Sequence, residues 1–390
     1  MTTSMYDQAR GMLTGNIIPF WKGLRDNEYG GFYGFMDFDL NLDKKAVKGG
    51  ILNSRILWFF SSAAMALEDK SLLEEARHAY KFLTDVMLDK ENGGVYWSVG
   101  YDGAPADTTK HTYNQAFAVY ALSAYYDASR DEEALKHSWD IFHLIEGKCT
   151  DEFGYLEAFD REFNALPNDK LSGNGLMAEK TMNTLLHVLE GYSNLFRSTG
   201  DKRVEAAMER IFGIVLTKVY NPALRRQEVF FDREMNSLGN IHSFGHDIEA
   251  SWLLDWGAAM LSDQTLAQRV YAMTSELAKE TKLLAYDENS LWNERAGGVD
   301  DTNRIWWVEA EAVLGFLNEA RKNPEDTSFM EAARDTLAYI QKYIVDPRPG
   351  SEWFGRVNAA GEPIHDPILE PWKCPYHNGR MCIEIMKRNE

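Results

Sequence analysis

A few residues in this sequence have types and spacings suited to acid–base chemistry. His246 and Glu249 are three positions apart, so on a helix they share a face, and the carboxylate can orient the imidazole and raise its basicity. A second histidine, His377, is followed three positions later by Arg380, and Arg55 lies in an apolar stretch. An unperturbed imidazole has a pKa of about 6.5, so two histidines can accept or donate protons near neutral pH. A nearby guanidinium such as Arg55 could stabilise developing negative charge.

Tryptophans near these residues favour a carbohydrate ligand. Trp306 and Trp307 precede Glu309, and Trp372 precedes His377. Flat aromatic faces stack on the C–H faces of pyranose rings and leave the hydroxyl groups free for hydrogen bonds. Tryptophan is also a common core residue, so each of these rings could serve packing alone.

Six short segments rich in glycine and aromatic residues recur along the chain, such as Gly30–Gly34 and Gly93–Trp97, and apolar residues at helical spacing lie between them. Polar breaks divide each intervening stretch into two helices. The pattern predicts about twelve helices, near residues 5–20, 50–68, 71–87, 111–128, 132–146, 178–198, 201–218, 246–262, 265–281, 306–322, 328–345 and 377–388. We expect one all-α domain over residues 1–390, in which the high aromatic content favours a closed ring over an open solenoid.

The second, fourth, sixth, eighth and tenth helices are the more apolar members of their pairs, which predicts that they form the inner wall. Each inner helix nevertheless starts with polar or aromatic groups that repeat in phase with the helix pairs. They are Arg55; Tyr113; Asn183; His246 with Glu249; Trp307 with Glu309; and His377 with Arg380. His187 lies one turn after Asn183 and can face the same way. If all inner helices begin at one mouth, these groups converge on one pocket.

The composition of the chain limits the classes of molecule that it is expected to bind. A formal net charge of −19 disfavours nucleic acid and anionic membranes, which are bound mainly through Lys and Arg clusters. Three scattered cysteines suit a reducing compartment, and no signal-like or membrane-spanning stretch is evident. We expect a cytoplasmic protein, a monomer rather than a dimer, that binds a small molecule.

A metal site is the alternative interpretation of His242, His246 and Glu249, since the histidines have His-x3-His spacing. Gly245 is expected to mark the start of the helix, which would leave His242 in the preceding loop, and no third strong ligand is nearby. We therefore expect neither a metal nor a cofactor.

Three motifs resemble those of the N-acylglucosamine 2-epimerase superfamily: Asn53–Trp58, Gly245–Leu254 (GHDIEASWLL) and Pro375–Arg380. The similarity spans nearly the whole chain. It implies an (α/α)6 barrel with short β-hairpins and loops at one mouth, and no redox cofactor. Carried over by position, it makes His246 and His377 the acid/base pair, Glu249 the partner of His246, and Arg55 an essential electrostatic group. It implies substrate contacts by Tyr113, Asn183, His187, Trp307, Glu309 and Trp372.

The resemblance favours inversion at C2 of the reducing-end glucose of a β-1,4-linked disaccharide, through ring opening and a cis-enediolate. Mannose isomerases and N-acylglucosamine epimerases share the same core residues, so both stay open as alternatives. A glycoside hydrolase would need two carboxylates flanking the glycosidic bond, for which Glu249 and Glu309 are the candidates. A non-catalytic sugar-binding barrel would need no pair of histidines.

Overall fold

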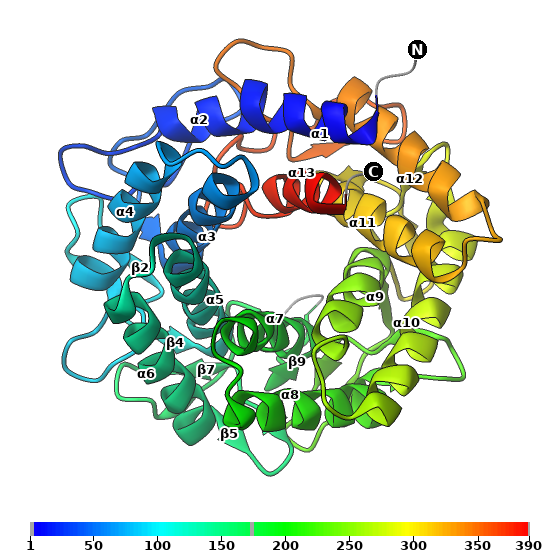
Figure 1. Cartoon of the computed structure of the whole chain (residues 1–390), viewed down its shortest axis with the longest axis horizontal. Helices are drawn as coiled ribbons and strands as arrows, with labels where there is room; N and C mark the ends of the chain where they lie inside the picture. The colour runs from blue at the N-terminus through cyan, green and yellow to red at the C-terminus, as the bar shows by residue number, and fades with distance from the viewer. Residues whose placement is uncertain (1–3, 172–174, 389–390) are drawn as a thin grey trace.

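A computed structural model describes residues 4–171 and 175–388 and shows two concentric rings of helices, an (α/α)6 barrel (Figure 1). The inner helices are α3 (Gly50–Ala66), α5 (Thr112–Ser129), α7 (Met182–Thr199), α9 (Phe244–Ala258), α11 (Trp306–Lys322) and α13 (His377–Arg388). The outer ring consists of the continuous run α1 (Met5–Met12), η1 (Leu13–Ile17) and α2 (Ile18–Gly23), followed by α4 (Leu72–Phe82), α6 (Glu132–Lys148), α8 (Lys202–Ile214), α10 (Gln264–Ala285) and α12 (Ser328–Tyr339). Inner and outer helices alternate along the chain.

Burial explains which helix of each pair lies inside. Inner helix α3 is buried continuously from Gly50 to Ala64, as expected of a helix that is apolar on all sides. Outer helix α4 buries only one face, which includes Leu72, Ala76 and Phe82. The ring closes because α13 packs against both α3 and α11. The predicted inner wall is therefore confirmed.

Three outer helices end in a π-helical turn, and the backbone is extended directly after each turn. These turns are η2 (Leu83–Met87), η3 (Val215–Val219) and η4 (Ile340–Ile344). The strands that follow are short and pair in small antiparallel sheets. They are β1 (Lys48–Gly49), β2 (Ser98–Val99), β3 (Pro105–Asp107), β4 (Lys110–His111), β5 (Thr150–Asp151), β6 (Gly154–Tyr155), β7 (Ala158–Phe159), β8 (Ala165–Leu166), β9 (Lys180–Thr181), β10 (Tyr220–Asn221), β11 (Arg226–Gln227), β12 (Phe230–Phe231), β13 (Ser237–Leu238), β14 (Ile241–Ser243), β15 (Tyr286–Asp287), β16 (Ser290–Leu291), β17 (Glu294–Ala296), β18 (Val299–Asp301), β19 (Arg304–Ile305) and β20 (Arg356–Val357).

A buried basic residue lies two positions before the start of five of the six inner helices. Its contacts hold the segment that leads into the helix. These residues are Lys48, Lys110, Lys180, His242 and Arg304. Lys48 Nζ lies 2.6 Å from the Asp26 carboxylate, and Lys110 Nζ lies 3.2 Å from that of Asp89. Both acids follow an outer helix, so each ion pair joins the end of one outer helix to the start of the next inner helix.

The twelve expected helices are confirmed, with ends that differ by at most four residues. The helix expected from residue 178 begins at Met182, because Thr181 caps it by accepting a hydrogen bond from the Thr184 amide at 3.1 Å. The helix expected from 246 begins at Phe244, so Gly245 does not mark its start. A Cβ atom on Gly245 would lie 2.6 Å from the Trp307 ring, so glycine here permits close packing of α9 against α11.

None of the helices in the described residues is both long enough and apolar enough to span a membrane.

Candidate active site

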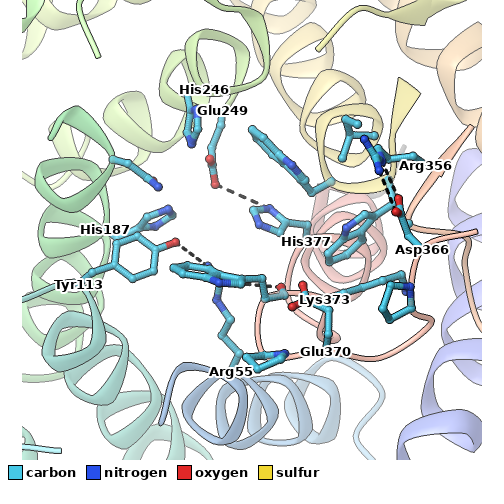
Figure 2. A pocket seen from close by; sticks show the side chains of 18 of the residues that line it. Arg55, Tyr113, His187, His246, Glu249, Arg356, Asp366, Glu370, Lys373 and His377 are labelled. Carbon is cyan, nitrogen blue, oxygen red and sulfur yellow. Dashed lines mark hydrogen bonds and ion pairs between the residues drawn. The ribbon is translucent and has the colours of Figure 1, made fainter. Parts of the chain in front are cut away.

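A cavity of about 600 Å³ lies where the inner helices begin. Nine of the ten predicted site residues line it: Arg55, Tyr113, Asn183, His187, His246, Glu249, Trp307, Trp372 and His377 (Figure 2). They come from all six inner helices and from the segment before α13. The in-phase polar groups therefore converge on one cavity, except Glu309 and Arg380, which do not line it.

His246 and His377 both pack against the Trp307 ring. The centre of the Trp307 ring is 4.9 Å from that of His246 and 5.4 Å from that of His377. Nδ1 of His246 lies 2.7 Å from Ser243 Oγ, whereas Nδ1 of His377 lies 2.7 Å from Glu311 Oε1. Burial lowers the pKa of His246 to about 3 and that of His377 well below its usual value, so both rings are neutral at pH 7 and can accept a proton.

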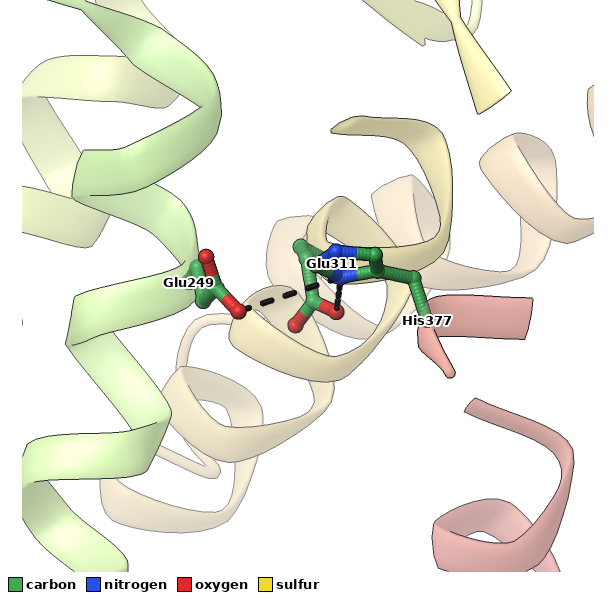
Figure 3. A group of neighbouring side chains, drawn as sticks. All are labelled: Glu249, Glu311 and His377. Atoms are coloured by element: carbon green, nitrogen blue, oxygen red, sulfur yellow. Dashed lines mark hydrogen bonds and ion pairs between the residues drawn. The ribbon is translucent and has the colours of Figure 1, made fainter. Parts of the chain in front are cut away.

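The predicted contact between Glu249 and His246 is wrong. The Glu249 carboxylate instead accepts a hydrogen bond from Arg380 at 2.6 Å, and it lies 3.8 Å from His377 (Figure 3). Glu311, which the sequence interpretation missed, lies closest to His377 and also accepts from Arg380 at 2.7 Å and from the Trp252 indole at 2.8 Å. His377 is therefore the histidine with a carboxylate partner, Glu311, whereas His246 contacts the hydroxyl group of Ser243.

Arg380 contacts three carboxylates, of which Glu249 lines the cavity. Besides Glu249 and Glu311, its guanidinium contacts Glu190 of α7, and all four side chains are at most 2% exposed. Burial raises the pKa values of Glu249 and Glu311, and their mutual repulsion adds to this for Glu249, although Arg380 opposes the shift. This cluster links α7, α9, α11 and α13 and contacts His377 through Glu249 and Glu311.

Arg55 brings a positive charge to the cavity wall without an acidic partner. Its guanidinium donates to the Tyr113 hydroxyl at 2.8 Å and packs over the Phe117 and Tyr376 rings. No carboxylate forms an ion pair with it in the described parts of the chain. The side chain is 2% exposed, so its charge is poorly screened and can stabilise an anion formed in the cavity.

Glu309 does not line the cavity, so its predicted role as a substrate contact is corrected. Both of its oxygens accept from the Leu291 amide, at 3.1 and 3.2 Å, and the side chain is fully buried. Glu309 lies two positions from Trp307, which places it near the opposite side of α11, whereas Glu311 lies four positions away on the same side. The spacing from Trp307 was the signal that could have identified Glu311.

The segment before α13 supplies cavity residues that the helical pattern did not reveal. They are Gly355, Arg356, Asp366, Pro367, Glu370, Pro371 and Lys373, and Phe35 follows α2. Arg356 and Asp366 form a two-bond ion pair, with distances of 2.5 and 2.8 Å. Residues in loops follow no helical period, so only Trp372 stood out in the sequence.

The cluster His242, His246 and Glu249 is not assembled, because His242 Nε2 lies 2.9 Å from Asp247 and its side chain does not line the cavity. Within the described residues, Glu249, Glu311 and His377 form a group whose potential ligand atoms lie within 4.8 Å of one another. The Arg380 guanidinium already contacts both carboxylates of this group, so a metal ion would have to compete with a fixed positive charge.

Comparisons with known proteins agree with this geometry. A sequence model of the N-acylglucosamine 2-epimerase family matches residues 30–379. The cellobiose 2-epimerase of Eubacterium cellulosolvens is 49% identical over 391 residues, covering 96% of each chain. The crystal structure of a sugar epimerase from a ruminal bacterium has a TM-score of 0.97 at 46% identity, covering 99% of this chain and all of that one.

A second solved structure, of the cellobiose 2-epimerase from Bacillus thermoamylovorans, has a TM-score of 0.95 at 39% identity and covers 98% of this chain and 99% of that one. The match of the family model and of these relatives extends over nearly the full length and includes the cavity. The chain therefore belongs to the N-acylglucosamine 2-epimerase family and is an isomerase of the epimerase type.

Proposed function

We propose that this protein is a cellobiose 2-epimerase that inverts C2 of the reducing-end glucose of β-1,4-linked disaccharides. It would convert cellobiose to glucosyl-mannose, and lactose to epilactose. The observation that carries the proposal is the presence of two neutral histidines in one cavity, both within contact distance of the Trp307 ring. Inversion requires one base to remove a proton and a second group to return a proton to the opposite face.

The proposed reaction begins with opening of the reducing-end ring, because the C2 proton is acidic only beside a free carbonyl. One histidine removes the proton to give a cis-enediolate, whose negative charge Arg55 stabilises. The other histidine returns a proton on the opposite face. Epimerisation is reversible, so His246 and His377 each act as the base in one direction.

The disaccharide is favoured by the relatives' specificity and by the extent of the cavity. A volume of about 600 Å³ exceeds the need of one sugar ring. Trp307 packs against both histidines, so a reducing-end ring stacked on Trp307 would lie within reach of both imidazoles. Trp372, from the segment before α13, would stack on the second ring. Tyr113, Asn183 and His187 would bind hydroxyl groups along the wall.

Three other reactions could in principle be catalysed in a barrel of this kind. N-acylglucosamine epimerisation and mannose isomerisation use the same core residues and would differ in the product formed. Glycoside hydrolysis by Glu249 and Glu309 lacks its second carboxylate, since Glu309 binds the Leu291 amide away from the cavity.

We also infer that the protein is a single-domain monomer in the cytoplasm. Its three cysteines are free and buried, which suits a reducing compartment.

Product analysis in D2O tests the proposal. Cellobiose, lactose, mannose and N-acetylglucosamine are incubated with the protein, and products are separated by chromatography and examined by proton NMR. We expect 2-epimers of the two disaccharides, with deuterium at C2, because a proton carried by histidine exchanges with solvent. A hydrolase would release monosaccharides unlabelled at C2. An epimer that fully retains its original C2 hydrogen would exclude the two-histidine route.

A further inference from the structure

Glu190 is a buried carboxylate that contacts the cavity wall without lining the cavity. It lies three positions after His187 on α7 and is 2% exposed. Its Oε2 lies 2.9 Å from His187 Nδ1 and also accepts from the Tyr376 hydroxyl, while its Oε1 contacts Arg380. Three donors therefore converge on one carboxylate.

These contacts keep Glu190 ionised and acceptor-only. Burial raises its pKa, but the Arg380 charge and the hydrogen bond from His187 outweigh burial and lower the pKa to about 2. An ionised carboxylate cannot donate a hydrogen bond, so His187 must donate from Nδ1. Burial lowers the pKa of His187, so the ring carries this single proton and Nε2 keeps its lone pair.

The surroundings of His187 leave Nε2 for the ligand. The Tyr113 ring meets the imidazole edge-on at 5.1 Å, and the Phe117 ring lies 4.9 Å away, so the plane of the imidazole is fixed. His187 lines the cavity beside Tyr113 (Figure 2). Nε2 has no hydrogen-bond partner among residues 4–171 and 175–388. An acceptor therefore faces the cavity at this point.

A hydrogen-bond acceptor at Nε2 of His187 complements the hydrogen-bond donors of Arg55. The Arg55 guanidinium donates to the hydroxyl of Tyr113, the neighbour of His187, so the same wall already supplies hydrogen-bond donors. A sugar hydroxyl group both accepts and donates, and it is fully satisfied when one neighbour donates and another accepts. Two donors would leave the hydroxyl proton unpaired in a buried site, which weakens binding.

We propose that Glu190 is a positioning residue that fixes His187 as a hydrogen-bond acceptor for a substrate hydroxyl group. This rests on the proposed function for the identity of the substrate. Replacing Glu190 by Gln puts an amide group, which can donate, opposite Nδ1. The imidazole proton can then move to Nε2, and His187 becomes a second donor.

The control is Glu146→Gln. Glu146 also accepts from two tyrosines, Tyr155 at 2.7 Å and Tyr192 at 2.8 Å, and from Arg210 at 2.7 Å, but it lies on outer helix α6. Histidine-selective 15N NMR of the unliganded wild type should show His187 protonated at Nδ1 only. Glu190→Gln should shift this proton toward Nε2, and Glu146→Gln should leave it in place.

Kinetics on the disaccharide complete the test. Glu190→Gln should raise KM by about tenfold, as expected for one lost hydrogen bond in a buried site. In a His187→Ala background the same change should alter KM by less than about threefold, because its effect passes through His187. A wild-type His187 protonated at Nε2, or an equal KM effect in both backgrounds, overturns the proposal. The tautomer is read without turnover, so a wild type that fails to epimerise sugars would overturn only the proposed function.

Discussion

Nδ1 of His377, the first residue of α13, lies 2.7 Å from the carboxylate of Glu311 on α11, 66 positions earlier in the chain. Arg380 and Trp252 also donate to that carboxylate. These contacts orient the His377 ring so that Nε2 is the nitrogen available for proton transfer. His246, with Ser243 as its neighbour, lacks this carboxylate. The two proposed acid/base groups are therefore not equivalent.

His246→Ala and His377→Ala should each lower epimerase turnover by about 10²- to 10⁴-fold, because each removes one of the two proton carriers. His143→Ala is the control, since His143 stacks on Trp139 of outer helix α6. Initial rates on cellobiose are measured alongside circular dichroism to confirm folding. Retention of more than about a tenth of wild-type turnover would remove that histidine from the mechanism.

Glu311→Gln and Glu309→Gln form a matched pair on one helix, since both glutamates are fully buried and lie two positions apart. Glu311→Gln should lower kcat by roughly 10- to 100-fold, because an amide cannot stabilise the imidazolium form of His377. Glu309→Gln should change kcat by less than about twofold. Equal losses in the two variants would show that Glu311 acts only through packing.

Glu309 should make stability pH-dependent. Burial raises its pKa to about 8, whereas the unfolded carboxyl group ionises near 4.5. The folded protein therefore binds the extra proton, and this contribution to stability is fully present below pH 4.5 and is lost as pH rises toward 8. Between pH 5 and 8 the free energy of unfolding of the wild type should fall, relative to E309Q, by roughly 2 kcal/mol or more. Urea titrations at several pH values measure this, and parallel curves would contradict it.

Trp372→Ala should reduce kcat/KM for cellobiose about fivefold or more, with a smaller effect on a monosaccharide, because aromatic stacking is worth roughly 1 kcal/mol. Trp372 lines the cavity and packs on Tyr113 at 5.6 Å. Trp139→Ala on outer helix α6 serves as the control. Equal losses on both sugars would place Trp372 at the reducing end or in a purely structural role.

The periodic part of the molecule was predictable from the sequence. Helical spacing identified both rings, and polar groups in phase with the helix pairs identified residues such as Arg55, Asn183 and His377. Partners across the ring could not be predicted, because they depend on how far each helix is shifted along its neighbour. His246 and Glu249 share the spacing of His187 and Glu190, yet only the second pair forms a contact, at 2.9 Å. In the first pair, Arg380 holds the glutamate instead.

Closure of the ring has a consequence for biosynthesis. During translation, α3 emerges early, but α13, which must pack against it, emerges only after α11. Until then the nascent chain is an open arc whose two end helices present apolar surface to solvent. Such surfaces attract chaperones or other nascent chains. A ribosome that stalls between α11 and α13 would leave an aggregation-prone product that lacks His377 and has no complete cavity.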